Sequence, residues 1–246
     1  MNLSFIVPAY NESERIEASI IKMIDYFSRQ PYVYEVIVVD DGSRDNTPDI
    51  VRRYAGERIR LLQQPRNMGK GAAVRRGMLE GKGEFRIFSD ADFSTPITET
   101  ERMLEFLESY DVVIGSRAID ESFIREHQPW YRETMGKIFN RMVQLVAVSG
   151  IKDTQCGFKG FRGEAATQIF SRTLIDGFSF DVEALFLARS LGYSIKEIPV
   201  EWYNDARSTL NPISDSLKMF RELLKIRSLH RDRPISGSVR KEIGLH

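Results

Sequence analysis

The first half of this chain alternates short β-branched runs with segments of helical pattern, and this order constrains its fold most strongly. The short runs are typical of buried strands, and the longer segments place apolar residues on one helical face. Alternation of this kind predicts an α/β fold with a mostly parallel sheet and helices on both faces. The predicted strands are 3–7, 35–39, 58–63, 85–89 and 111–115, and the predicted helices are 12–27, 47–54, 70–81 and 98–107.

The second half of the sequence is less regular. Residues 118–130 have the mixed charge of a loop, and the glycine-rich stretch 153–162 is predicted to be irregular. The other predicted elements are helices 131–148, 181–191 and 212–229 and a strand over 193–200. We expect a single domain over residues 1–230, made of the halves 1–117 and 118–230, and a frayed tail over 231–246.

Composition excludes several classes of protein. The chain has 246 residues, of which 42% are hydrophobic and 28% charged, as in ordinary globular domains. Its 35 basic and 35 acidic residues give a formal net charge of zero, so we expect no nucleic-acid partner. Cys156 is the only cysteine, which excludes an intrachain disulfide. We expect neither a signal peptide nor a transmembrane helix, because no apolar run approaches about 18 residues.

Polar motifs follow four of the predicted strands, at residues 8–12, 40–43, 90–94 and 115–117. Parallel strands bring their carboxyl ends to one edge of a sheet, and ligands of such sheets bind outside that edge. The four segments are therefore expected to converge on one site, which is a stronger signal than any single motif.

Asp90 and Asp92 are the first pair of carboxylates at this edge. Two carboxylates separated by one residue can hold one hard cation, and Mg²⁺ or Mn²⁺ suits such oxygen ligands. The cation would neutralise a diphosphate and stabilise it as a leaving group. Two solvated loop carboxylates are the alternative, and this alternative would be favoured if the pair stood alone.

Asp40 and Asp41 form a second pair, which could accept hydrogen bonds from a base or a ribose hydroxyl. The alternative is a simple turn, because Asp, Gly and Ser are turn formers. Lys70 lies in the glycine-rich stretch 67–71 before a helix, where backbone N–H groups and a lysine can approach an anion. A flexible turn with a surface lysine is the alternative there.

These motifs resemble those of the family 2 glycosyltransferases of GT-A fold. The resemblance rests on VPAYNE at 7–12, VDDGS at 39–43, GKG at 69–71 and DAD at 90–92. In the second half, DTQCGFK at 153–159, FDVE at 180–183 and EIPVEW at 197–202 resemble the dolichyl- and polyprenyl-phosphate glycosyltransferases. The dolichyl-phosphate β-glucosyltransferase branch is the most similar, and the dolichol-phosphate mannose synthases are related.

The resemblance implies an inverting, metal-dependent transfer of a hexose to a polyprenyl or dolichyl phosphate, with glucose from UDP-glucose as the expected donor. Residues 1–117 would bind the nucleotide sugar, and residues 118–230 would bind the acceptor and carry interface helices. Mg²⁺ or Mn²⁺ would be the cofactor. The expected donor-binding residues are Pro8, Ala9, Tyr10, Glu12, Asp40, Asp41, Lys70, Asp90 and Ala91; the metal ligands are Asp90, Asp92 and Ser94; the residues that bind the acceptor phosphate are Arg117 and Arg132; and the catalytic residues are Asp90, Asp92 and Asp181.

Three alternatives stay open: GDP-mannose as donor, a soluble glycan or phosphorylated small molecule as acceptor, and a non-catalytic nucleotide-binding subunit of a membrane complex. A phosphate monoester has a second pKa of about 6, so a lipid phosphate would need little help from a base. Asp153, Asp181 and Glu183 are nevertheless candidates for a base or for binding sugar hydroxyls, and Asp181 could instead cap a helix.

The predicted helix 212–229 is amphipathic and basic, which is typical either of an interfacial helix or of a helix packed on the core. Its expected apolar face comprises Ile213, Leu217, Phe220, Leu223, Leu224 and Ile226, and its basic face comprises Lys218, Arg221 and Lys225. With a lipid acceptor in view, we expect a cytoplasmic protein that binds peripherally to the cytoplasmic face of a membrane.

Overall fold

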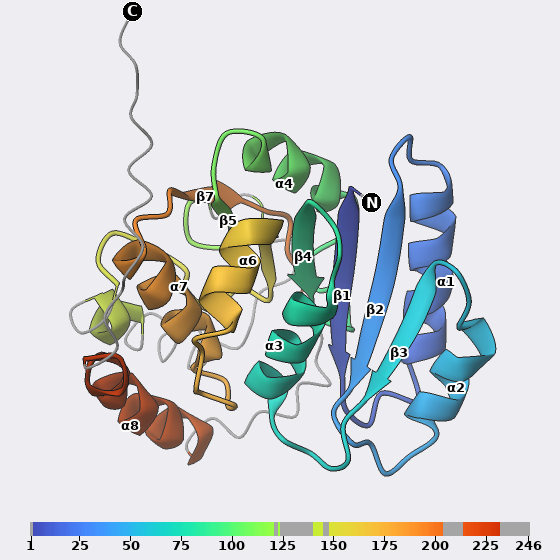
Figure 1. The fold of residues 1–246 in the computed structure, drawn as a ribbon, viewed down its shortest axis with the longest axis horizontal. Coiled ribbons are helices and arrows are strands. Elements are labelled where there is room, and N and C mark those ends of the chain that lie inside the picture. The colour runs from blue at the N-terminus through green and yellow to red at the C-terminus, as the bar shows by residue number, and fades with distance from the viewer. Residues whose placement is uncertain (1, 121–122, 124–139, 145–147, 204–213, 232–246) are drawn as a thin grey trace, which may run out of the picture.

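The computed structural model describes residues 2–120, 123, 140–144, 148–203 and 214–231, with the side chains of 214–218 excepted (Figure 1). The strands are β1 (Leu3–Ala9), β2 (Tyr34–Asp40), β3 (Ile59–Gln63), β4 (Phe85–Ser89), β5 (Val112–Ser116), β6 (Phe158–Arg162) and β7 (Ile195–Pro199). The helices are α1 (Ile16–Ser28), α2 (Thr47–Tyr54), α3 (Lys70–Glu80), α4 (Glu99–Leu107), α6 (Gly163–Phe170), α7 (Phe180–Ser190) and α8 (Ser214–Leu229).

The described strands form one sheet in the order β3-β2-β1-β4-β6-β5-β7. Strand β6 runs antiparallel to both β4 and β5, while every other neighbouring pair is parallel. The prediction of a mostly parallel sheet flanked by helices is therefore confirmed. The sheet joins the two halves of the sequence, because β6 from the second half separates two strands of the first.

Two apolar layers cover the sheet, one on each face (Figure 1). One layer is packed by α1, α2 and α4, whose buried side chains include Ile20, Val51 and Met103. The other layer contains buried residues of α3, α6, α7 and α8. Alternate strand residues point to opposite layers, so Phe5 packs in the first and Ile6 in the second. Burial on both faces explains why the strands read as continuous apolar runs.

The prediction that residues 153–162 are irregular is wrong for the last five of them, which form β6. Glycines suggested irregular backbone, yet Gly160 lies inside the strand because a helix packs closely on it. A Cβ at Gly160 would lie 2.8 Å from Leu107 Cδ1 and 2.9 Å from Met103 Cγ. Its neighbours Phe158 and Phe161 are fully buried in opposite layers. The sequence argument also missed α6.

The predicted helix 131–148 falls mostly outside the described residues, but 140–144 are helical. The predicted C-terminal helix is α8, and its apolar face differs from the expectation. Leu223 and Ile226 are buried in the core, whereas Leu224 is 53% exposed. Residue 213 and the side chain of residue 217 lie outside the described part. Among the described residues, no helix combines the length and the apolar character that crossing a membrane requires.

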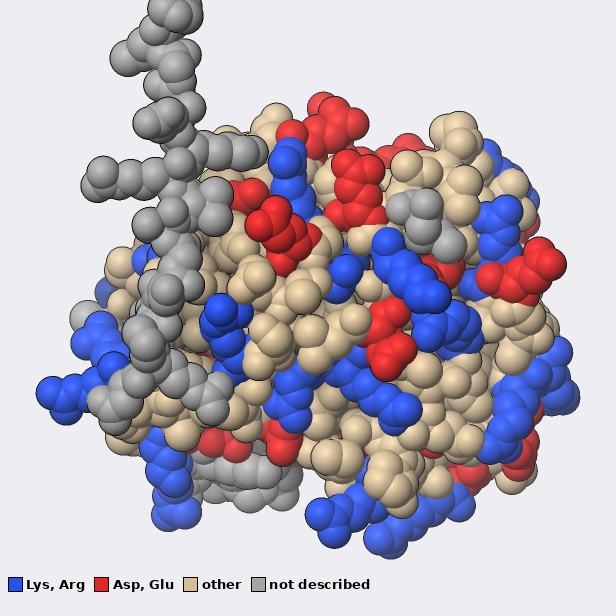
Figure 2. All heavy atoms as spheres, in the orientation of Figure 1, with Lys and Arg blue, Asp and Glu red and all other residues tan. Residues whose placement is uncertain are grey.

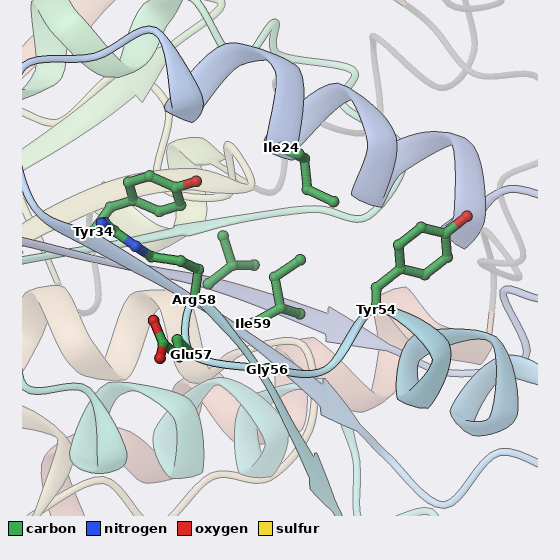
Figure 3. A pocket seen from close by; sticks show the side chains of 8 residues that line it. Ile24, Tyr34, Tyr54, Gly56, Glu57, Arg58 and Ile59 are labelled. Carbon is green, nitrogen blue, oxygen red and sulfur yellow. The ribbon is translucent and has the colours of Figure 1, made fainter.

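A cavity of about 270 Å³ opens at the amino ends of β2 and β3 (Figure 3). Its lining is mainly apolar and comprises Ile24, Tyr34, Val36, Tyr54, Gly56, Glu57, Arg58 and Ile59. The guanidinium of Arg58 lies 4.9 Å above the centre of the Tyr34 ring. This cavity is at the opposite end of these strands from Asp40, so it is separate from the predicted site.

Candidate active site at the carboxyl edge of the sheet

The predicted site residues do converge on one edge of the sheet. Ala9 ends β1, Asp40 ends β2, Asp90 directly follows β4, and Arg117 directly follows β5. Because β6 is antiparallel, its amino end reaches the same edge, and it brings residues 153–157 to the site. The antiparallel strand that sequence reasoning missed therefore supplies one wall of the site.

Asp90 packs directly against the backbone of Gly157. The Asp90 N–H donates to the Gly157 carbonyl over 3.1 Å. A Cβ at position 157 would lie 2.0 Å from Asp90 Oδ2, a distance that no real side chain tolerates. Gly157 therefore contacts the predicted metal ligand directly, and residue-by-residue reasoning did not single it out, although it lies within the segment that carries the family resemblance.

Lys70 points at the predicted metal ligand. Its Nζ lies 2.6 Å from Asp90 Oδ1 as an ion pair, although outside hydrogen-bond geometry. Burial alone would lower the pKa of Lys70, but Asp90, Asp181 and Asp92 outweigh burial and raise it. The ammonium group is thus kept charged beside three carboxylates, where it can attract a diphosphate.

The backbone around Lys70 does not offer the predicted anion site at the start of α3. The N–H groups of Gly71 and Ala72 donate to the Asp176 carbonyl over 2.8 and 3.3 Å. Gly69 has a φ of 105°, and a Cβ there would lie 2.3 Å from the same carbonyl oxygen. These glycines are needed for close packing of the loop after α6, and Lys70 contributes its side chain.

Asp92 stands next to Asp90 at the edge. Its Oδ1 accepts a hydrogen bond of 2.9 Å from the Ser94 N–H. Burial and the neighbouring Asp90 charge raise the pKa of Asp92 above the ordinary range, while Arg15 and Lys70 oppose the rise. Ala91 between the two carboxylates is held by the Ser19 hydroxyl, which donates to its carbonyl over 2.7 Å.

A divalent cation fits this pair of carboxylates. Asp90 Oδ1 lies against the Lys70 ammonium, but 34% of the Asp90 side chain is exposed, so a metal could bind this carboxylate beside the ion pair. Within the same residues, no group of three or more His, Cys, Asp and Glu could hold a metal by itself. Mg²⁺ characteristically binds through one or two carboxylates and takes water and substrate phosphates as its other ligands. Asp90 and Asp92 match that arrangement.

The second carboxylate pair faces inward. Asp41 is 3% exposed. Its oxygens accept hydrogen bonds from Gln64 Nε2 and from the N–H groups of Met68 and Gly69, over 2.8, 2.8 and 2.9 Å. Burial nevertheless raises the pKa of Asp41. Asp41 therefore fixes the loop that leads to Lys70.

Asp40 is equally buried, at 1% exposed. Its Oδ1 accepts from the Ser43 N–H over 3.2 Å. This hydrogen bond closes a turn, which is the alternative that the sequence analysis left open for Asp40 and Asp41.

The loop after β1 lies open beside this turn. Pro8 and Ala9 are buried at the end of the strand, and Tyr10 is 38% exposed. The Glu12 N–H donates to Thr47 Oγ1 over 2.8 Å, and its carboxylate pairs with Arg15, whose Nη2 lies 2.7 Å from Oε1. Tyr10 and its neighbour Asn11 are thus the exposed residues at the start of this loop, where a donor could contact them.

Asp181 is the second residue of α7, which begins at Phe180 and has Ser179 at its N-cap position. Its Oδ1 lies 2.6 Å from Nζ of Lys159, which is fully buried and also donates to the Cys156 carbonyl over 2.5 Å. Burial raises the pKa of Asp181, with Lys159 and Lys70 opposing. The capping alternative is therefore wrong, and Asp181 is 4% exposed.

Glu183 is not accessible as a base. It is fully buried and accepts hydrogen bonds from the N–H groups of Leu174 and Ile175. His230, which follows α8, contacts the same carboxylate over 2.7 Å. Glu183 thus joins α7, the loop before it and the end of α8.

Arg117 is paired with Asp153. Its Nε and Nη2 donate to the two carboxylate oxygens over 2.7 and 2.9 Å, and its backbone N–H donates to Oδ2 over 3.1 Å. This pairing lowers the pKa of Asp153 to about 2 in spite of burial. The guanidinium also lies 5.5 Å from the centre of the Trp202 ring. Arg132, the second predicted phosphate ligand, lies outside the described residues.

The chain is similar to known glycosyltransferases in sequence and in fold. The family model described as "Glycosyl transferase family 2" matches residues 4–170. A dolichyl-phosphate beta-glucosyltransferase of Trichomonas vaginalis is 40% identical over 236 residues, which are 91% of this chain and 70% of the relative. The human dolichyl-phosphate beta-glucosyltransferase is 34% identical over 241 residues, with coverage of 92% and 74%.

A solved structure has the same fold. It is glucosyl-3-phosphoglycerate synthase from Mycobacterium tuberculosis, in complex with Mn²⁺, UDP and glucosyl-3-phosphoglycerate. The TM-score is 0.69 at 18% identity, and the match covers 93% of this chain and 79% of that one. At this identity the likeness concerns the fold alone, and it confirms the predicted GT-A fold.

Proposed function

This chain belongs to glycosyl transferase family 2, and on that premise we propose that it transfers glucose from UDP-glucose to a dolichyl or polyprenyl phosphate. Membership of the family makes the chain an enzyme, a glycosyltransferase, rather than a non-catalytic nucleotide-binding subunit. The acceptor class is taken from the relatives, which are named for glucosyl transfer to dolichyl phosphate.

One observation carries the proposal: the cationic and anionic parts of the site lie close enough to interact. The Asp90 N–H donates to the Gly157 carbonyl, and Asp153 of the same short loop binds the Arg117 guanidinium, so this loop links the two parts. A donor diphosphate held near Asp90 and Lys70 and an acceptor phosphate held near Arg117 would therefore be neighbours. Such closeness is the main requirement for a transfer that proceeds by positioning.

Asp90 and Asp92 would hold Mg²⁺ or Mn²⁺, which supplies positive charge against the leaving diphosphate. Lys70 would donate to the diphosphate oxygens, and Tyr10 would contact the nucleotide from the open loop. The chain's own cations therefore lie on both sides of the sugar to be transferred, Lys70 at the donor and Arg117 at the acceptor. Charge that develops on the diphosphate is stabilised by groups already in place.

The acceptor needs little base catalysis in this proposal, because a phosphate monoester is already largely ionised near neutral pH. Attack of one phosphate oxygen on the anomeric carbon forms the new bond as the bond to UDP breaks, which inverts the configuration. Asp181 would then act by its charge near Lys70 rather than by taking a proton. Arginine suits the acceptor because its planar fork matches phosphate oxygens.

We also propose that the protein binds peripherally to the cytoplasmic face of a membrane, where such an acceptor would be presented. The outer side of α8 supports this proposal, since Leu224 is 53% and Leu229 is 39% exposed among the basic residues Arg221, Lys225 and Arg227. Figure 2 shows Lys and Arg side chains on the surface at this corner of the molecule, the lower left of the view. A helix surface of this kind can lie against anionic lipid. Leu224→Glu should reduce sedimentation with phosphatidylserine vesicles, while Leu79→Glu, a change at a 41% exposed leucine of α3, should not.

The transfer itself is tested with purified protein, a short polyprenyl phosphate and Mg²⁺ or Mn²⁺, supplied with UDP-glucose or GDP-mannose. We expect a glucosylated lipid phosphate from UDP-glucose, no product with the matching polyprenyl alcohol, and loss of product with EDTA. A mannosylated product would contradict the proposed donor. Release of UDP without glycolipid would contradict the proposed acceptor and point to a soluble one.

A further inference from the structure

Glu197 on β7 reaches across to the loop that precedes β6. Its two carboxylate oxygens accept hydrogen bonds from consecutive backbone N–H groups, Lys152 to Oε2 over 3.0 Å and Asp153 to Oε1 over 2.8 Å. Strand β7 is parallel to β5, and Glu197 pairs with Ile114, three residues before Arg117. The carboxylate is thus held by the strand next to the one that ends in Arg117.

The loop held by Glu197 carries the carboxylate that orients Arg117. Asp153 is 7% exposed, and its position is further fixed by the Gln155 N–H, which donates to Oδ1 over 3.2 Å. Asn140 Nδ2 also donates to the Lys152 carbonyl. Because these contacts fix the backbone on both sides of Asp153, the loop holds the Asp153–Arg117 pair as one unit.

Asp153 uses only one side of the guanidinium. It accepts from Nε and from one N–H of Nη2, which leaves three of the five N–H donors of an arginine. One remaining hydrogen on Nη1 and one on Nη2 form a second fork, which has the geometry that binds a phosphate through two oxygens. Trp202 covers one face of the guanidinium, 5.5 Å from its carbon.

We propose that Glu197 is a positioning residue for the acceptor: it fixes the 152–153 loop, so that Asp153 holds Arg117 with its second fork turned to the acceptor phosphate. This inference rests on the proposed function, which assigns a lipid phosphate to Arg117. Asp153 offsets much of the charge of Arg117, so recognition depends on the direction of the fork more than on net charge. A small shift of the loop therefore changes acceptor binding and leaves the donor side at Asp90 and Lys70 intact.

The test is the steady-state kinetics of Glu197→Gln with a short polyprenyl phosphate and UDP-glucose. Glutamine keeps the size of the side chain but turns an NH₂ group toward one of the two backbone N–H donors. We expect the KM for the polyprenyl phosphate to rise at least about tenfold, with kcat and the KM for UDP-glucose within about twofold. Lys196→Gln is the matched control on the same strand, since Lys196 lies over the rings of Phe106 and Tyr110 instead.

A double variant adds a second readout, and Glu197→Asp, which keeps the carboxylate but shortens its reach, serves if Glu197→Gln folds poorly. If Glu197 acts through Asp153, the combination of Glu197→Gln and Asp153→Asn raises the acceptor KM no further than Asp153→Asn alone. Equal changes in both KM values, or a loss confined to kcat or to the melting temperature, would mean that Glu197 is only structural and would overturn the inference.

A lower acceptor KM in either variant would also overturn it, because Asp153 would then be competing with the phosphate for Arg117. Failure of the proposed function is distinguishable, since in that case the unmodified protein forms no glycolipid while UDP is still released. Failure of the inference alone leaves transfer by the unmodified protein intact.

Discussion

Replacing Gly157 with alanine is expected to disable catalysis without unfolding the protein. The added Cβ would lie 2.0 Å from Asp90 Oδ2, 2.4 Å from Cγ and 2.7 Å from Oδ1. Gly157 has no positive φ, so alanine itself fits the backbone. The carboxylate must therefore move, and the Asp90 side chain is 34% exposed, which gives it room to swing toward solvent.

The size of the effect follows from the distance. Ordinary contacts with a Cβ begin near 3.4 Å, so the carboxylate has to move by more than 1 Å from its position 2.0 Å away. A displacement of about 1 Å at a reacting centre can reduce the rate about 10²-fold, or about 2.7 kcal/mol of transition-state stabilisation. The free energy of unfolding should change by less than about 1 kcal/mol, because alanine also restricts the unfolded chain.

The assay compares kcat/KM for glucosyl transfer, Mn²⁺ binding and urea denaturation in Gly157→Ala and Gly56→Ala. Gly56 is the matched control, because a Cβ there meets nothing within 4 Å. We expect transfer and Mn²⁺ binding to fall in the first variant and both to be unchanged in the second. A kcat/KM of Gly157→Ala within about threefold of that of the unmodified protein would refute the role given to the contact between Gly157 and Asp90.

Three further predictions concern charged groups. Asp90→Ala should lower transfer by about 10³-fold or more and weaken Mn²⁺ binding, because a metal ligand is lost; residual transfer near the normal rate would remove Asp90 from the metal site. Lys159→Met should lower the free energy of unfolding by about 3–5 kcal/mol in urea titrations, since it leaves Asp181 buried and unpaired; a double variant with Asp181→Leu should recover much of this loss. The pKa of Asp153 is lowered from 3.8 to about 2 in the folded protein. Ionised Asp153 therefore contributes about 2 kcal/mol to the free energy of unfolding above pH 3.8, and this contribution is lost as the pH falls through about 2. Arg117→Met should flatten that acid dependence, and an unchanged pH profile of the unfolding free energy would contradict it.

Much of the fold could be predicted from local pattern. The strands β1 to β5 were predicted to within about two residues, because strands buried on both faces give continuous apolar runs. Strand β6 could not be predicted in this way. Gly160 inside this strand contacts α4, Gly157 just before it contacts Asp90, and such contacts leave no periodic signal in the sequence.

The residues of the site differ in the same way in how far local sequence pattern could identify them. Asp90, Asp92, Lys70 and Arg117 could be predicted because each stands at the end of a strand or the start of a helix. Gly157, Lys159 and Glu197 escaped residue-by-residue reasoning, because each acts through a partner that is distant in the sequence. Their segments were visible only through the family resemblance of residues 153–159 and 197–202.

The place of β6 in the sheet has a consequence for the order in which the protein folds. Strands β4 and β5 are close in sequence, but β6 lies between them and is made last of the three. During synthesis, the inner edges of both strands stay unpaired until residue 162 leaves the ribosome, and unpaired edges invite association with other chains. The same late pairing brings Gly157 against Asp90, so Asp90 reaches its final position only when β6 has joined the sheet. Chains released before that point would carry the DAD motif but not the geometry that it needs.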